Sequence, residues 1–361
     1  MTTVKEIVGA MAGATAEDVV TIEKAYDYSK KAHEGQKRYS GEPYFIHPAA
    51  TAKTLAEYGM DAMTIAAGLL HDAVEDGRVS RVEIEKEFGK EMLFIVDGVT
   101  KLGTHKYRGA ERHAESLRRL LVATASDIRV LIVKLADRKH NMETLEHVPE
   151  AKRRRIALET LEIYGPIADR LGMGKMKRAL EDLAFPYVDP DAAAHTAEVR
   201  KLKTQETESG LAKMQKELKQ ELAKKELQNF RTDIRMKGLW SLHQKLKRKH
   251  DDISLIHDIA ALRIIVPTIE DCYATLGVVH ALYKFKDEIA CQKKNGYQSL
   301  HTTVVTPDAG IVEIQIRTEE MHRRAQFGIA SHMSYKQLGK DIEKLDKEVQ
   351  KSRFSSLSFT W

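Results

Sequence analysis

The sequence predicts a multidomain α and α+β protein, in which an all-helical part is followed by a helical connector and a mixed α/β part. The length of 361 residues exceeds what one hydrophobic core usually organises. Helical periodicity fills the first half of the chain, and strand-like runs gather in the second half. We therefore expect a helical domain at 1–190, a connector at 191–230, a mixed domain at 231–339, and a C-terminal helix and tail at 340–361.

The helical pattern of the first half is nearly continuous from Glu17 to Tyr187. Apolar residues recur there at spacings of three and four. The clearest segments are Met60–Val74, Ile84–Val96, Ala114–Ala125 and Lys152–Leu171. Such spacing places the apolar side chains on one face of each helix, so we expect these helices to pack together as a bundle.

The connector between Pro190 and Lys225 is dense in lysine and glutamate and poor in large apolar residues. Apolar residues do not persist at the a and d positions of heptads, which argues against a coiled coil. The pattern predicts a solvated helix.

Strand-like residues dominate the mixed domain. Ala261–Val266 and Gln298–Val305 are rich in β-branched residues, and Ile311–Ile316 alternates after the turn sequence Pro-Asp-Ala-Gly at 307–310. This pattern predicts a sheet that contains a hairpin. The charged segment Lys340–Arg353 predicts one more helix.

Composition excludes several protein classes. Cys272 and Cys291 lack a CxxC spacing, so we expect neither a disulfide framework nor a thiolate zinc site. The apolar runs are shorter than the about 20 residues that a membrane span needs, and the N-terminus lacks the pattern of a secretory signal. The net charge of +5, from 58 basic and 53 acidic residues, is mild. We expect a cytoplasmic protein whose partners include neither a membrane nor DNA.

Four ionisable side chains follow an apolar helical run in the segment IAAGLLHDAVED. Spacing of i and i+4 pairs His71 with Glu75 and Asp72 with Asp76 on adjoining faces. A single His-Asp doublet usually forms an ordinary surface pair. The wider sequence changes that interpretation, because two more polar residues lie within apolar surroundings.

These two residues are His47, in PYFIHPAA, and Asp137, in VLIVKLADRKHN. Burial of several ionisable groups without partners would cost several kcal/mol, and a divalent cation removes that penalty. The resulting ligand set is His47, His71, Asp72 and Asp137. Imidazole and carboxylate ligands together accept Mn²⁺, Fe²⁺ or Zn²⁺. Such a site produces hydroxide near neutral pH, while a nearby carboxylate, here Glu75 or Asp76, moves protons.

The segments GQKRYSGEPYFIHP, LLHDAVED, VDGVTKL and VKLADRKHNMETL closely resemble the HD-type hydrolase domain of the long RelA/SpoT family. Members of this family make and hydrolyse guanosine tetra- and pentaphosphate, (p)ppGpp, in the stringent response. The resemblance runs from about residue 20 to residue 187. It implies hydrolysis of the 3′-pyrophosphate of (p)ppGpp to GDP or GTP and pyrophosphate.

The same resemblance implies residue roles. His47, His71, Asp72 and Asp137 would bind Mn²⁺, and Glu75 and Asp76 would activate or orient the attacking water. Arg38, Ser40, Asn141 and Thr144 fall on nucleotide-contacting positions. Tyr39 stands where the family often has lysine, so we expect an altered contact there.

A second group of polar residues lies in the mixed domain. Asp258 precedes the apolar run that contains Arg263, and Glu313, Gln315 and Arg317 alternate in VEIQIRT, so they share one strand face. One carboxylate from each of two elements can hold Mg²⁺ over a triphosphate. The segment KFKDEIACQKKNGYQ, treated as a loop, adds Lys286, Lys293 and Lys294 for phosphates and Tyr297 for stacking on a purine.

From about Arg235 to Lys336 the chain resembles the nucleotidyltransferase-like synthetase domain of the same family, through NGYQSLHTTV and VEIQIRT. The resemblance implies transfer of the β,γ-pyrophosphate of ATP to the 3′-hydroxyl of GDP or GTP. It implies that Asp258 and the catalytic Glu313 bind Mg²⁺ and that Tyr297 stacks on guanine. Further substrate contacts are implied for Asn295, His301 and Gln315 in the acceptor pocket, for Arg235, Lys237, Arg263 and Lys286 toward ATP, and for Lys293 toward phosphate.

Three departures concern this second domain. The chain reads HALYKFKDEIA without the Pro/Gly/Arg-containing loop that is usual before FKDYIA, Glu288 replaces a tyrosine, and Gly238 replaces a histidine or aspartate. Loss of an arginine and gain of a carboxylate beside a polyphosphate are electrostatically unfavourable. We therefore expect hydrolysis to persist and synthesis to be weakened or lost.

An alternative, non-catalytic function would use the same pockets to bind nucleotide without turning it over. The chain would then be a catalytically idle guanine-nucleotide sensor or a ribosome-associated regulatory module. A ribosome contact is expected only if the C-terminal regulatory domains of the long family members exist beyond Trp361.

Overall fold

The computed structural model describes residues 2–76, 79–103, 127–227, 229–256, 258–292, 297–307 and 310–331. These residues fall into two compact units. The first unit consists of the described residues up to Arg155, together with Ala330 and Ser331. The second unit is Ile156–Ile329. In the described parts of the chain, every helix is too short or too polar to cross a bilayer.

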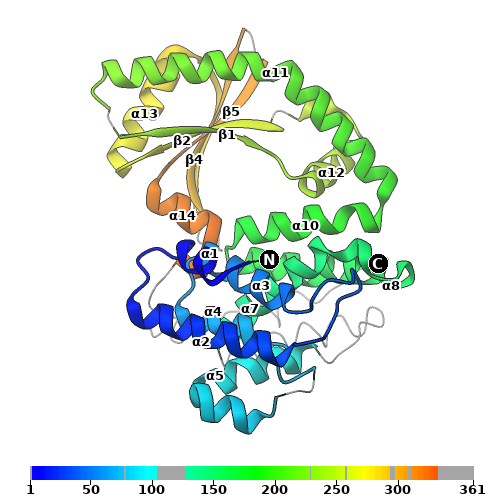
Figure 1. Cartoon of the computed structure of the whole chain (residues 1–361). Helices are drawn as coiled ribbons and strands as arrows, with labels where there is room; N and C mark the ends of the chain where they lie inside the picture. Colours follow the sequence, from blue (N-terminus) through cyan, green and yellow to red (C-terminus); the bar gives the residue numbers. More distant parts are fainter. Residues whose placement is uncertain are drawn as a thin grey trace, which may run out of the picture. The chain divides into compact units, whose positions relative to one another are not determined.

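The first unit is all-helical, as predicted (Figure 1). Its elements are α1 Val4–Gly9, α2 Ala16–Ala32, α3 Ile46–Glu57, α4 Ala62–Leu70, α5 Arg81–Gly103, α7 Ile128–Glu143, the short 3₁₀ helix Leu145–His147, and most of α8 Glu150–Glu159. Thr3 and Thr15 begin α1 and α2 with capping boxes, in which a hydroxyl and a carboxylate satisfy the free N–H groups of the first turn. The predicted helix Ala114–Ala125 lies outside the described residues.

Helix α4 is the centre of this bundle. All of its residues except Met63 are buried, and it contacts α2, α3, α5 and α7. Gly68 permits the close approach of α3, because a Cβ at this position would clash with Leu55. The apolar run ends at Leu70, so His71 and Asp72 follow at the end of an almost fully buried helix. Packing of α4 against α3 and α7 therefore positions the polar residues of the bundle.

The second unit begins with helices and continues into a sheet. Its helical elements are the end of α8, the π-helical turn Thr160–Tyr164, α9 Gly165–Arg170, α10 Gly174–Val188, α11 Pro190–Lys224, α12 Leu239–Arg248, the 3₁₀ turn Ile253–Leu255, α13 Ile269–Leu282, α14 Glu319–Phe327 and the first half of the 3₁₀ turn Gly328–Ser331. Its strands are β1 Arg231–Met236, β2 Ala260–Val266, β3 Lys284–Gln292, β4 Gln298–Thr306 and β5 Gly310–Thr318.

The described strands form one sheet in the order β1-β2-β5-β4-β3. The β2–β5 pair is parallel and the other pairs are antiparallel. Gln315 on the central strand β5 lies opposite both Arg263 on β2 and His301 on β4. The register thus places three of the predicted substrate-binding residues in one row across the sheet, and the mixed α/β prediction is confirmed.

The predicted solvated connector is a helix, α11, but one of its faces is buried, which corrects the prediction. Leu211, Met214, Leu218 and Leu222 belong to the core that also contains residues of β2, β4, β5 and α13. These four residues recur at spacings of three and four, so they form one apolar stripe. The surrounding lysines and glutamates concealed this stripe when composition alone was considered.

Two strands were not predicted. Arg231–Met236 forms β1, and Lys284–Gln292 forms β3, although the sequence analysis treated the latter segment as a loop. Both are edge strands, and charged residues are common on edges because one side of such a strand lacks a partner. Charge therefore hid the strand character. The predicted helix Lys340–Arg353 lies outside the described residues.

Candidate metal centre and candidate nucleotide cavity

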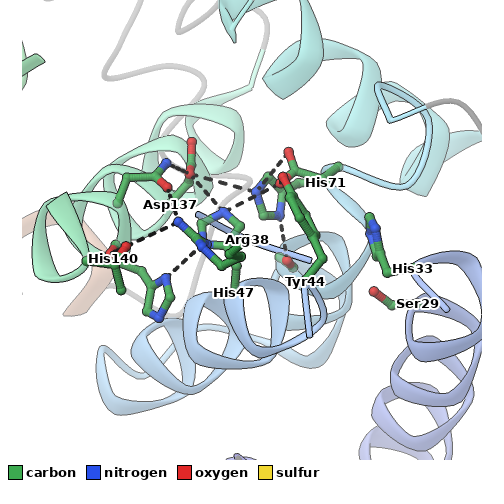
Figure 2. A network of polar contacts seen from close by, with 12 residues as sticks. Ser29, His33, Arg38, Tyr44, His47, His71, Asp137 and His140 are labelled. Carbon is green, nitrogen blue, oxygen red and sulfur yellow. Dashed lines mark hydrogen bonds and ion pairs between the residues drawn. The ribbon is translucent and has the colours of Figure 1, made fainter. Parts of the chain in front are cut away.

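The first candidate site lies where α3, α4 and α7 meet. His47 is in the first turn of α3, His71 and Asp72 follow α4, and Asp137 is in α7. His47 Nε2 is 3.2 Å from Asp137 Oδ1 and 3.5 Å from Asp72 Oδ2, and His71 Nε2 is 3.2 Å from Asp72 Oδ1. Figure 2 shows both imidazoles turned toward Asp137. The structure therefore brings together the four residues that the motifs predicted as ligands.

One buried nitrogen of this cluster, His71 Nε2, has no hydrogen-bond partner among the described residues. His71 Nδ1 is 2.8 Å from the carbonyl oxygen of Gly68, and a carbonyl only accepts, so Nδ1 carries the proton of the neutral ring. His71 Nε2 is buried and makes no hydrogen bond within the described part of the chain. Its lone pair thus faces carboxylate oxygens, an arrangement that is repulsive until a cation lies between them.

The donor set fits a divalent cation. The ligand atoms of His47, His71 and Asp137 all lie within 4.8 Å of one another, and all three residues are buried. Two imidazole nitrogens with hard carboxylate oxygens suit Mn²⁺, Fe²⁺ or Zn²⁺. We conclude that the first unit contains a cluster able to hold a divalent metal ion.

Each carboxylate of the cluster has a further partner. The Tyr44 hydroxyl donates to Asp72 at 2.8 Å, and Lys134 Nζ lies 2.7 Å from Asp137. Burial would raise the pKa of Asp72, but the neighbouring His71 and His47 rings outweigh burial and lower it. The pKa of Asp137 is likewise held well below its usual range, because Lys134 outweighs the effect of burial. Both carboxylates are therefore ionised and ready to bind a cation.

His140, one turn after Asp137 on α7, contacts the cluster through His47. The two Nδ1 atoms are 2.9 Å apart. Burial, and then the neighbouring His47 and Arg38, lower the pKa of His140 to about 3. His140 is therefore a neutral ring beside a predicted ligand. His140 was not among the site residues predicted from the sequence.

Glu75 and Asp76 lie in the turn after α4, where the backbone N–H of Asp76 donates to the carbonyl of Asp72. Both residues are exposed at the edge of the cluster. Partial desolvation of the carboxylate and then the charge of Asp72 raise the pKa of Glu75. A raised pKa and access to water suit a group that takes up and releases a proton.

Three of the predicted nucleotide-contacting residues gather beside the cluster. The Arg38 guanidinium donates to Asn141 Oδ1 at 3.0 Å and to Thr144 Oγ1 at 3.2 Å, and the amide of Asn141 donates to Asp137. Ser40 instead donates its hydroxyl to Glu42 at 3.1 Å. Its neighbour Tyr39 is 67% exposed. Arg38, Asn141 and Thr144 thus form one polar group, which Ser40 does not join.

The second candidate site is a cavity of about 970 Å³ within the second unit. It is lined by predicted site residues from β1, β2, β4 and β5 and from the segments beside these strands: Arg235, Lys237, Asp258, Arg263, Tyr297, His301, Glu313 and Gln315. Lys293 and Asn295 lie outside the described residues, and so does the side chain of Lys286, whose backbone is in β3.

The two predicted magnesium ligands line the same cavity with different neighbours. Asp258 accepts from Lys237 and Lys245, each at 2.6 Å. Burial would raise the pKa of Asp258, but the two ammonium groups outweigh burial and lower it. Glu313 accepts from Gln315 at 2.6 Å and lies 3.2 Å from His301. Its pKa is also lowered, because these neighbours outweigh burial.

Two known protein families match this chain, one over the candidate metal centre and one over most of the candidate nucleotide cavity. Residues 25–174 match the HD domain, and this match contains all four residues of the candidate metal centre. Residues 234–340 match a region found in RelA/SpoT proteins. This match contains Asp258, and it contains the strands β2 and β5, which carry Arg263 and Glu313. The chain belongs to the RelA/SpoT family.

Curated relatives of this RelA/SpoT chain carry both kinds of enzyme name. It is 46% identical over 341 residues to a GTP pyrophosphokinase of Myxococcus xanthus, a match that covers 92% of this chain and 45% of the relative. It is 44% identical over 327 residues to a guanosine-3′,5′-bis(diphosphate) 3′-pyrophosphohydrolase of Aquifex aeolicus, with 88% of this chain and 46% of the relative covered. The chain spans less than half the length of these relatives.

Two arginines that line the cavity of this RelA/SpoT chain were missing from the predicted site. Arg317 is 1% exposed, and its Nε, like that of the 7% exposed Arg263, has no hydrogen-bond partner in the described structure. Alternation in VEIQIRT had placed Arg317 on the strand face of Glu313, but no role was predicted for it. Arg178 lies on α10, outside both matched regions, and no local pattern marks it.

Proposed function

We propose that the first unit hydrolyses the 3′-pyrophosphate of (p)ppGpp to GDP or GTP and pyrophosphate, and that the second unit is the matching synthetase. The hydrolase would lie within 1–190 and the synthetase within 231–339, and the protein would act in the cytoplasm in the stringent response. The observation that carries the proposal is the buried convergence of His47, His71 and Asp137, with an unpartnered nitrogen aimed at carboxylates.

His47, His71, Asp72 and Asp137 would hold Mn²⁺ in the hydrolase. When bound, the cation lowers the pKa of a water so that it can attack phosphorus near neutral pH. Glu75, exposed and raised in pKa, would accept the proton of that water, and Asp76 would orient it.

The nucleotide would bind beside the cluster. Arg38 is already held by Asn141 and Thr144, so its guanidinium is fixed before substrate arrives. A preorganised guanidinium suits a pyrophosphate group, because it offers several donors in one plane. Ser40 would contribute only after leaving Glu42, which makes it a weaker candidate for substrate contact.

In the second unit, Asp258 and Glu313 would hold Mg²⁺ over the triphosphate of ATP. Phosphoryl oxygens would draw Lys237 and Lys245 away from Asp258 and thereby free its carboxylate. Arg235 and Arg263, with Lys286, would neutralise the charge of ATP. Tyr297 would stack on the guanine of GDP or GTP, held by its hydrogen bond to His301. Catalysis there is mainly positioning and charge neutralisation.

Synthesis is proposed to be the weaker activity. Helix α13 ends at Leu282 and β3 begins at Lys284, so Tyr283 alone connects them. This direct connection leaves no space for the basic loop that the family usually carries at this position. Fewer cations near the triphosphate mean weaker binding of ATP.

The test uses one preparation for both reactions. With Mn²⁺ and (p)ppGpp we expect release of pyrophosphate and GDP or GTP, which a chelator abolishes and fresh Mn²⁺ restores. With Mg²⁺, ATP and GDP we expect slower synthesis. An idle nucleotide sensor would bind (p)ppGpp without releasing pyrophosphate, and that result would refute the hydrolase.

A further inference from the structure

We propose that His140 is a positioning residue of the metal centre, which accepts the Nδ1 proton of His47 and so keeps His47 Nε2 free for the cation. The inference rests on the proposed metal-dependent function. His140 touches neither the carboxylates nor the shared centre of the ligand atoms through any described contact, and acts through His47 alone.

The geometry requires one shared proton. His47 Nδ1 and His140 Nδ1 are 2.9 Å apart, and the residues are 2% and 8% exposed. Two ring nitrogens at this distance form a hydrogen bond only if one carries a proton and the other offers a lone pair. Figure 2 shows this contact on the side of His47 that faces away from Asp137.

Two arrangements of that proton exist, and only one is compatible with metal binding. If His140 donates, neutral His47 carries its own proton on Nε2, where it points at Asp137 Oδ1, 3.2 Å away. If His47 donates, Nε2 presents a lone pair to the same place. A cation selects the second arrangement, so the acceptor nitrogen of His140 is what makes His47 a ligand.

The other histidine of the cluster does not have this choice. His71 Nδ1 faces the Gly68 carbonyl, which can only accept, so backbone fixes the tautomer of His71. The tautomer of His47 is instead set by a side chain that can be replaced. Helix α7 therefore supplies both a ligand, Asp137, and the residue three positions later that orients a ligand on α3.

The experiment measures Mn²⁺ affinity by calorimetry and the absorption spectrum of bound Co²⁺, both without substrate. His140→Leu removes the acceptor, and His140→Asn keeps an oxygen acceptor near the place of Nδ1. His33→Leu is the matched control, because His33 is also buried beside the cluster but bonds Gln36. Melting of the metal-free proteins checks folding, and His140→Phe replaces His140→Leu if the latter does not fold.

We expect His140→Leu to bind Mn²⁺ roughly 10- to 100-fold more weakly, as for other partners of metal-binding histidines, with an altered Co²⁺ spectrum. His140→Asn should recover most of the affinity and the wild-type spectrum, and His33→Leu should match the wild type. Equal affinity of His140→Leu and wild type would overturn the inference and leave the proposed function standing. If His140→Leu and His140→Asn bound Mn²⁺ equally weakly, or if His33→Leu bound it as weakly, His140 would contribute only packing. Absence of Mn²⁺ binding by the wild type would overturn both.

Discussion

The carboxylate of Asp182 on α10 accepts a hydrogen bond of 3.1 Å from the backbone N–H of Trp240, in the first turn of α12. Gly238 is the N-cap of α12 and has no side chain to satisfy these N–H groups. A Cβ on Gly238 would lie 3.0 Å from both Asp182 oxygens. Asp182 thus replaces the missing N-cap side chain, and the glycine leaves room for it. The contact with Asp182 thus explains why a glycine at position 238 is accommodated where the family usually has histidine or aspartate.

Asp182→Ala should therefore destabilise the second unit by about 1 kcal/mol, the usual value of an N-cap. The measurement is urea unfolding followed by the fluorescence of Trp240. Asp169→Ala is the control, since it removes a half-exposed ion pair with Lys177 and should change stability little. Gly238→Ser should crowd Asp182 in the wild type but recover stability in Asp182→Ala. Additive effects of the two substitutions would contradict the capping role.

Asp72→Asn should abolish hydrolysis of (p)ppGpp while the fold remains intact. The amide keeps the shape of the side chain and removes the negative charge that lies 3.2 Å from His71 Nε2. The rate should fall by more than about 100-fold, beyond the loss caused by an outer partner of a metal ligand. His71→Ala should have the same effect.

The control for Asp72→Asn is Asp61→Asn, at the opposite end of α4. Asp61 caps the helix by accepting from Thr64 N, and asparagine caps helices equally well. Pyrophosphate release, far-ultraviolet circular dichroism and bound Mn²⁺ are measured for each protein. Full turnover by Asp72→Asn would remove Asp72 from the proposed ligand set.

Arg317→Met should stabilise the second unit and weaken nucleotide binding. Burial, and then the charges of Arg263 and Arg235, lower the pKa of Arg317 to about 10, which shows that its cation is costly in this cavity. Its described side-chain partner is His322 Nδ1, at 2.9 Å. We expect a gain on the order of 1–3 kcal/mol from an apolar side chain of similar length.

Titration of the second unit with ATP and Mg²⁺ would report the accompanying loss of affinity. Arg231→Met serves as the control, because Arg231 is on the same sheet but forms an exposed pair with Glu319. This control should change stability by at most about 1 kcal/mol. A destabilised Arg317→Met protein that still binds ATP normally would show that Arg317 supports the fold and not the nucleotide.

Glu181→Gln should make stability less dependent on pH. Burial raises the pKa of Glu181 from 4.5 to about 7 in the folded protein, and Lys177, 3.9 Å away, only partly opposes this. Between these two pH values the unfolded chain has lost the proton that the folded chain retains. Raising the pH therefore favours unfolding until about pH 7, above which both states are ionised and the loss stays constant.

The advantage of Glu181→Gln over the wild type should thus grow between pH 4.5 and pH 8 by up to about 3 kcal/mol. Urea unfolding at several pH values measures it. Glu208→Gln, on the exposed side of α11, is the matched control and should follow the wild-type profile. Parallel profiles for Glu181→Gln and wild type would show that Glu181 is ionised throughout this range.

The sequence was most informative where a local pattern fixes the chemistry. Periodicity located α4, α5 and β5, because burial of one face leaves its trace every three to four residues in a helix and every two in a strand. β-Branched residues located β2 and β4. His71 and Asp72 were identifiable because they end an unusually apolar helix. Periodicity failed for β1 and β3, since charged residues on edge strands conceal the alternation.

By itself, then, the sequence determined the order of the elements, the residue types of the metal centre and the family to which they belong. Only the tertiary structure decided that His140 faces His47, that Asp182 caps the helix of Trp240, and that Arg178 and Arg317 line one cavity. The physical reason is that periodicity records which side of an element is buried. It does not record which atoms of distant segments meet there, and that is decided by how closely helices and strands pack.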